Sequence, residues 1–120
     1  KRFREIVKGV ARSLQCSAEI EYVREHSPVV NDAAMADFVR DVARGIVGKR
    51  NVIDAEPSMG GEDHAAYQEI APGCYTFVGA APRKGEAFPH HHPRFNPDED
   101  VLEIGAALMV ESARRWLERG

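Results

Sequence analysis

The chain has 120 residues, which is enough for one small domain and excludes two ordinary ones. Its composition lies near the globular average, which excludes a disordered or fibrous protein. Sixteen basic and nineteen acidic residues give a net charge of −3 without a block of like charge, so we expect neither a nucleic-acid partner nor a membrane partner.

The first predicted element is an amphipathic helix over residues 2–15, because apolar residues recur there at helical spacing. These residues are Phe3, Ile6, Val7, Val10 and Leu14. No initiator Met and no capping residue precede the helix, so we expect a helix cut from a longer chain. Residues 18–25 then alternate loosely between apolar and polar, which is typical of a strand.

A second helix is predicted to begin after Asn31 and Asp32, which are good N-cap residues, and to end at Gly48. Its broad apolar face consists of Met35, Phe38, Val39, Val42, Ile46 and Val47. Further along, the patterns predict a short edge strand at residues 52–53, one or two helical turns at residues 65–70 and a strand at residues 74–80.

A proline-rich loop is predicted over residues 82–97, after which Asp98 is expected to cap the last helix. The buried positions expected on that helix include Val101, Leu102, Ile104, Leu108, Met109, Trp116 and Leu117. The element order predicts an α/β or α+β arrangement. Two or three strands leave much apolar helix surface uncovered, so we expect further polypeptide or a partner chain to cover it.

The histidine run in this loop, His90, His91 and His92, is the feature richest in possible chemistry. Neutral imidazole binds zinc, manganese, cobalt or nickel. Adjacent residues of an extended loop point in different directions, so a single inward-facing ligand is more plausible than three. The alternatives are a solvent-exposed basic loop and a loop that packs on its own helix.

The turn formed by Gly60, Gly61, Glu62 and Asp63 is the second candidate site. Two glycines let backbone pass close to a ligand. The two carboxylates have three possible roles: to bind metal, to accept hydrogen bonds from a histidine, or to cap a helix. The two cysteines, Cys16 and Cys74, match no CxxC spacing, so we expect reduced, buried thiols and a cytoplasmic location.

The order of several motifs resembles the C-terminal third of the metal-dependent amidohydrolase and peptidase family, which includes hippurate hydrolase, N-acyl-amino-acid amidohydrolases and auxin-conjugate hydrolases. The motifs are Val-Val-Asn-Asp at 29–32, Pro-Ser-Met-Gly-Gly-Glu-Asp at 57–63, Tyr-Thr-Phe-Val-Gly at 75–79, His-His-Pro-Arg-Phe at 91–95, Asp-Glu-Asp-Val-Leu at 98–102 and Ile-Gly-Ala-Ala-Leu at 104–108. The resemblance covers nearly the whole chain. One departure is His64, where many members have an aromatic residue.

The resemblance implies an α/β fold: an incomplete three-layer catalytic domain like that of zinc exopeptidases at residues 31–120. Before it, residues 1–30 would be the last helix and strand of an inserted α+β lid domain that also forms a homodimer. It further implies two zinc or manganese ions, one of them held by His91. Gly60 and Gly61 would line the substrate pocket, with Glu62 and Asp63 supporting the site.

The implied reaction is hydrolysis of an N-acyl amino acid or a similar amide. The remaining metal ligands and the general-base glutamate are expected upstream, so the segment alone should be inactive and should bind zinc weakly. Two alternatives stay open: a dipeptidase or carboxypeptidase of the same family, and a non-enzymatic metal-binding or interaction module.

Overall fold

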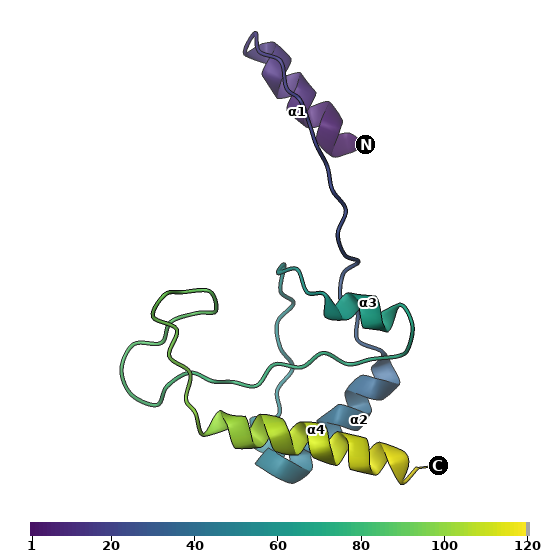
Figure 1. The fold of residues 1–120 in the computed structure, drawn as a ribbon, viewed down its shortest axis with the longest axis vertical. Coiled ribbons are helices and arrows are strands. Elements are labelled where there is room, and N and C mark those ends of the chain that lie inside the picture. The colour runs from purple at the N-terminus through teal and green to yellow at the C-terminus, as the bar shows by residue number, and fades with distance from the viewer. Residues whose placement is uncertain (120) are drawn as a thin grey trace.

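The structure, a computed structural model, describes residues 1–119. Within these residues the chain forms four α-helices and one short 3-10 helix: α1 (Arg2–Ser13), α2 (Ala33–Val47), η1 (Lys49–Asn51), α3 (His64–Gln68) and α4 (Val101–Leu117). Helices α2 and α4 pack across each other, whereas α1 stands apart at the end of a long extended stretch (Figure 1).

The predicted helices are present, with small shifts at their ends. Helix α2 begins where expected, because Asp32 Oδ1 accepts a hydrogen bond of 2.9 Å from the Met35 amide. It ends at Gly48, whose φ of 81° suits a residue without a side chain. The expected cap of α4 was wrong: Asp100 occupies the N-cap, and Asp98 Oδ1 instead accepts from the Asp100 amide at 3.1 Å.

A small core lies between α2 and α4, and one further buried residue lies in α3. Phe38 and Val42 of α2 and Ala65 of α3 are its buried apolar residues. The Phe38 ring meets Trp116 of α4 edge-on, with ring centres 5.6 Å apart. The prediction that Leu102, Met109, Trp116 and Leu117 are buried was wrong. They are 69%, 75%, 52% and 80% exposed, because only one face of α4 is covered.

No strand forms within residues 1–119, so this structure does not confirm the predicted α/β arrangement. Residues 18–25, 52–53 and 74–80 adopt no regular structure. A strand exists only when a neighbouring strand accepts and donates its backbone hydrogen bonds. Here the backbone N–H and C=O of Tyr75 are instead bound by the side chain of Asn31, at 2.7 and 2.8 Å.

The described chain is far from compact. Its radius of gyration is 20.2 Å, whereas a compact domain of this length has about 14 Å. It exposes 10472 Å² of surface, whereas a compact protein of its mass exposes roughly 6500 Å². None of the helices in residues 1–119 combines the length and apolar character that crossing a membrane requires. The helices have exposed apolar faces, as the small number of predicted strands led us to expect.

Candidate functional site

The histidine loop is fastened at its base. The Asp98 amide donates to the Ala80 carbonyl at 2.9 Å, which closes residues 80–98 into one loop. Arg83 forms ion pairs with Asp98 at 3.2 Å and with Asp100 at 3.1 Å. The loop is therefore attached to the turn that begins α4, which lies beside it in Figure 1.

A second set of contacts orders the interior of this loop. The Asn96 side chain accepts from the Phe88 amide at 3.2 Å and donates to the Glu86 carbonyl at 3.0 Å. The Phe88 ring stacks on His92 with centres 4.7 Å apart, and the Arg94 guanidinium carbon lies 4.1 Å from the Phe88 ring centre. These contacts join both sides of the histidine run.

The three histidines have different surroundings. His90 packs edge-on against Phe95 at 5.2 Å, and His92 Nδ1 accepts from the Arg94 amide at 3.1 Å. His91 is exposed and its side chain makes no hydrogen bond within residues 1–119. Its φ of 64° lies in the left-handed region, which few residues other than glycine adopt. The imidazole of His91 is thus available to a ligand; His90 is exposed as well and its side chain makes no hydrogen bond within residues 1–119, so the left-handed backbone is what sets His91 apart.

A metal site needs more than this imidazole. Within residues 1–119, no group of three or more His, Cys, Asp and Glu side chains is arranged to hold a metal ion. His91 fits the role of a single nitrogen ligand, since it is accessible and unpaired by its own loop. The remaining ligands of any such ion would have to come from other polypeptide.

The Gly60–Gly61 turn is open. A Cβ atom placed on Gly61 would meet nothing within 4 Å, and one on Gly60 would meet only Ser58 Oγ at 3.3 Å. Neither glycine has a positive φ. The contacts within this chain therefore do not require glycine at Gly61, and the space beside it is free for other groups.

Glu62 links this turn to the segment after α3. One carboxylate oxygen accepts from the His64 amide at 3.2 Å and the other from the Tyr75 hydroxyl at 2.8 Å. The Tyr75 hydrogen bond, followed by that from His64, lowers the pKa of Glu62, and the same bond to Glu62 raises the pKa of Tyr75. Glu62 therefore caps the first turn of α3 and holds Tyr75. Asp63 occupies the N-cap position without a side-chain cap bond.

A hydrogen bond between the side-chain amides of Gln68 and Asn31 also stabilises the region around Tyr75. Gln68 of α3 donates to Asn31 Oδ1 at 3.3 Å and accepts from the Val30 amide at 3.0 Å. Asn31 in turn binds both backbone groups of Tyr75. Residues 30–32, α3 and residues 73–75 thus form one hydrogen-bonded block, and the Asp32 amide adds a 3.0 Å bond to the Gly73 carbonyl.

Sequence reasoning missed the interior position of His64. Its Nε2 is buried and has no hydrogen-bond partner within the described chain. Its ring lies 5.4 Å from that of Tyr75 and 6.0 Å from that of Tyr67. The one feature of the sequence that could have drawn attention to His64 was its unusual place after the Glu62–Asp63 pair. No feature of the sequence indicated that Tyr75 would lie beside it.

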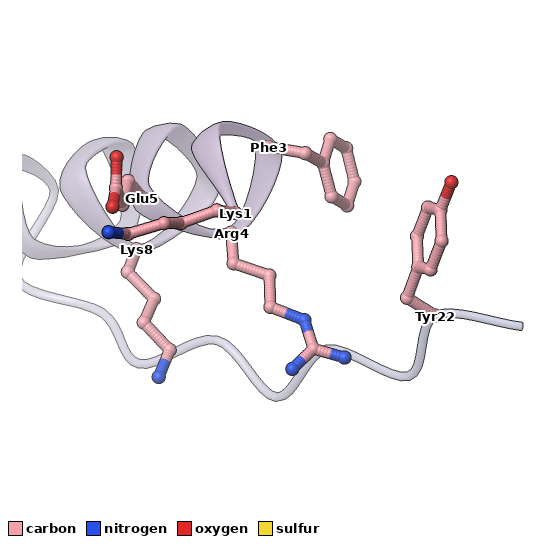
Figure 2. A pocket seen from close by; sticks show the side chains of 6 residues that line it. All are labelled: Lys1, Phe3, Arg4, Glu5, Lys8 and Tyr22. Atoms are coloured by element: carbon pink, nitrogen blue, oxygen red, sulfur yellow. The ribbon is translucent and has the colours of Figure 1, made fainter.

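Two hollows of the described surface have neither His91 nor the glycine turn in their lining. The larger, about 610 Å³, is an open cleft between α1 and the following extended stretch, where Phe3 and Tyr22 face each other and Arg4 and Lys8 reach towards the backbone opposite (Figure 2). The smaller, about 350 Å³, lies where residues 30–32 meet the end of α3. Neither hollow is lined by His91, Gly60 or Gly61.

The cysteines are free. Burial raises the pKa of the Cys74 thiol, which is partly buried, as expected. Cys16 is exposed, so the expectation that both thiols are buried was wrong for this residue. It follows α1, whose own apolar side chains are also uncovered.

Comparison with known proteins places the chain in a class of hydrolases. The model of peptidase family M20/M25/M40 matches residues 5–115. The chain is 33% identical to IAA-amino acid hydrolase ILR1-like 4 of Arabidopsis thaliana, over 98% of this chain and 28% of that protein. It is 33% identical to N-acetyl-L-cysteine deacetylase of Bacillus subtilis (strain 168), over 98% of this chain and 27% of that protein.

A third relative has a peptidase name. Thermostable carboxypeptidase 2 of Saccharolobus solfataricus is 32% identical over 86% of this chain and 26% of that protein. The chain belongs to peptidase family M20/M25/M40, which confirms the resemblance seen in the sequence. It spans less than a third of the length of each of these relatives.

Proposed function

We propose that this chain is the C-terminal part of a metal-dependent amidohydrolase that cleaves the amide bond of N-acyl amino acids. Two of the relatives are named as a hydrolase of an amino-acid conjugate and as a deacetylase of an N-acetyl amino acid. The chain aligns with them over 98% of its length. The substrate class is carried over from these names, and the rest of the enzyme is expected in further polypeptide.

The observation that carries the proposal is the arrangement of the histidine loop. The rings of His90 and His92 contact Phe95 and Phe88, whereas the exposed His91 contacts no aromatic ring within residues 1–119 and lies on a left-handed turn. His91 would therefore supply one ligand to a centre of two zinc or manganese ions. Such ions, when bound, polarise the amide carbonyl and lower the pKa of water. The segment itself holds one ligand and no general base, so it is inactive alone.

The Gly60–Gly61 turn would line the substrate pocket. The free space beside Gly61 supports this role, because no contact within the chain explains the missing side chain. Glu62 and Asp63 would support the site from behind: Glu62 fixes Tyr75 and the first turn of α3 through two hydrogen bonds. Neither carboxylate is needed as a metal ligand in this proposal.

The domain boundary is proposed near Val30. Helix α1 and its extended stretch would complete an inserted lid domain that dimerises, and residues 31–120 would join an α/β catalytic domain. The separation of α1 from the other helices in Figure 1 supports this division. In the intact enzyme, residues 18–25 and 74–80 would find partner strands. A cytoplasmic location remains the expectation from the two free cysteines.

A second candidate activity is that of a metallocarboxypeptidase. Its support is the relative named thermostable carboxypeptidase 2, which is nearly as similar as the amidohydrolases at 32% identity. Hydrolysis of N-acetyl amino acids and of unblocked dipeptides by the intact protein would separate the two activities. Preferential cleavage of the dipeptides would favour the carboxypeptidase.

The role of His91 is tested by His91→Asn in the intact protein. Asparagine tolerates a positive φ better than other side chains, so the loop keeps its backbone while the imidazole is lost. We expect bound metal, measured by elemental analysis, to fall and hydrolysis of N-acetyl amino acids to be lost. His90→Asn and His92→Asn are the controls and should retain metal. Full metal content and activity in His91→Asn would contradict the proposal.

A further inference from the structure

We propose that Asn96 is a positioning residue for His91: its side-chain amide fastens the loop so that the imidazole is held where a metal ion can bind it. This inference rests on the proposed role of His91 as a ligand. Asn96 lies five residues after His91, and its side chain is hydrogen-bonded to Phe88 and Glu86 rather than to His91 within residues 1–119. Its effect would pass through the backbone of the loop.

The amide of Asn96 closes the segment that contains the histidines. Its Oδ1 accepts from the Phe88 amide at 3.2 Å and its Nδ2 donates to the Glu86 carbonyl at 3.0 Å. Both partners precede the histidine run and Asn96 follows it. One side chain therefore ties together the two ends of residues 86–96 and uses its acceptor and one donor hydrogen to do so.

Within residues 86–96, whose ends are joined by the Asn96 side chain, the backbone makes two successive turns. The His92 amide donates to the Pro89 carbonyl at 3.2 Å, and the Phe95 amide donates to the His92 carbonyl at 2.9 Å. His91 lies within the first turn with a φ of 64°. A β-carbon disfavours this conformation, so it persists only where the surrounding contacts impose it. The Asn96 amide spans the turn with two hydrogen bonds, and the contacts of the Phe88 ring with His92 and Arg94 span it as well.

The aromatic contacts of the loop depend on the same tie. Because Asn96 holds the Phe88 backbone, the Phe88 ring stays in place against His92 and beneath the Arg94 guanidinium. His92 is thereby kept in the loop, and His91 is left as the outward imidazole. Metal–nitrogen bonds tolerate errors of about 0.2 Å, so a loosened loop should weaken the bond to His91.

The experiment uses the intact protein stripped of metal and titrated with Co²⁺, whose visible absorption reports the geometry of the ligands. For Asn96→Ala we expect a loss of Co²⁺ affinity of about 10–100-fold, the usual effect of removing a group that orients a ligand. We also expect an altered absorption spectrum at saturation. Asn51→Ala is the matched control: Asn51 is likewise exposed and donates to a backbone carbonyl, that of Val47, at 2.7 Å, but lies outside the loop.

Two further variants keep the test decisive. Asn96→Asp retains an acceptor for the Phe88 amide and loses the donor to Glu86, so its affinity should fall between those of the wild type and Asn96→Ala. Should Asn96→Ala fail to fold, judged by circular dichroism, Asn96→Asp alone decides. His91→Asn, which removes the ligand itself, sets the largest expected loss.

The outcomes separate the inference from the function on which it rests. If His91→Asn lowers Co²⁺ affinity while the folded Asn96 variants match the wild type in affinity and spectrum, the positioning role is wrong and the proposed function stands. If His91→Asn binds Co²⁺ as the wild type does, the proposed role of His91 is wrong. An equal loss in Asn51→Ala and Asn96→Ala would show a general structural effect and contradict the positioning role.

Discussion

The hydrogen bond between Tyr75 and Glu62 joins two titratable residues, of which Glu62 precedes α3 in the chain and Tyr75 follows it. It holds the pKa of Glu62 below its ordinary value, so folding favours the ionised carboxylate. The stability this contributes is present above the pKa of the unfolded chain and is lost as the pH falls through the lower folded value. For Tyr75 the pKa is raised, so its contribution is lost as the pH rises through the folded value.

We predict that Tyr75→Phe raises the pKa of Glu62 towards its ordinary value, because the largest cause of the shift is removed. Carbon-13 NMR of selectively labelled glutamate in the intact protein would measure it. Tyr67→Phe is the control, because Tyr67 is 70% exposed and Glu62 owes none of its shift to it. An unchanged Glu62 pKa in Tyr75→Phe would show that the bond does not form in solution.

Gly73 and Gly79 form a matched pair for testing the hydrogen-bonded block. A Cβ atom on Gly73 would lie 3.2 Å from Gln68 Cγ and 3.5 Å from His64 Nε2, whereas one on Gly79 would meet nothing within 4 Å. We expect Gly73→Ala to cost about 1 kcal/mol of stability, because Gln68 must shift away from Asn31. Gly79→Ala should cost less. Urea unfolding of the intact protein with both variants checks the difference.

Single residues of the site were predictable only in part. His91 was singled out because histidines in a run must point in different directions, and Asn31 and Asp32 because they cap helices. The partners of Asn31 and Glu62 lie 44 and 13 residues further along the chain, at Tyr75. The sequence carries no local sign of such pairings, so the Tyr75 bonds, the buried Nε2 of His64 and the hydrogen bonds of Asn96 were all missed.

At the scale of elements, helices were predictable and strands were not confirmed. A helix satisfies its own backbone, so local signals such as Asp32 and Gly48 are enough to place its ends. The cap of α4 was misplaced by two residues because Asp98 and Asp100 are equivalent in type, and only the turn between them decides. The alternation in residues 18–25 predicts a strand, but these residues adopt no regular structure here, because no neighbouring strand binds their backbone.

The two longest helices differ in how they are capped, and this predicts different mutational costs. Asp32 accepts a hydrogen bond from the first turn of α2, whereas Asp100 makes no such bond to α4. We expect Asp32→Ala to destabilise α2 by about 1 kcal/mol, and Asp100→Ala to have a smaller effect. The readout is hydrogen exchange of the Met35 amide in the intact protein. Equal exchange in the wild type and Asp32→Ala would contradict the cap.

At the scale of the whole molecule, the main feature is the large apolar surface that the helices expose. Helix α1 exposes Phe3, Ile6 and Val10, its C-cap residue Leu14 is also exposed, and α4 exposes Leu102, Met109 and Leu117. Against this stands a core of three buried apolar residues. Burial of apolar surface is the main favourable term in folding, so this chain has little of its own to stabilise it.

We therefore predict that the 120-residue chain alone has a radius of gyration near or above 20 Å and no sharp unfolding transition. X-ray scattering and thermal unfolding followed by circular dichroism would measure these properties. Binding of a dye that reports exposed apolar surface should be strong and should fall in the intact protein. A radius near 14 Å with a cooperative transition would show that the chain folds by itself.

Contacts at both ends of the long extended stretch between α1 and α2 leave a short segment between them without such contacts. Tyr22 is held near α1 by its contact with Phe3, at 6.1 Å between ring centres. On the other side, the Ser27 hydroxyl donates to Glu69 at 2.8 Å, and Val30 is bound to Gln68. Residues 23–26 lie between these contacts, so we expect any rotation of α1 against the hydrogen-bonded block to occur there. Shortening that stretch would restrict how far one part can swing over the other while leaving the contacts within each part intact.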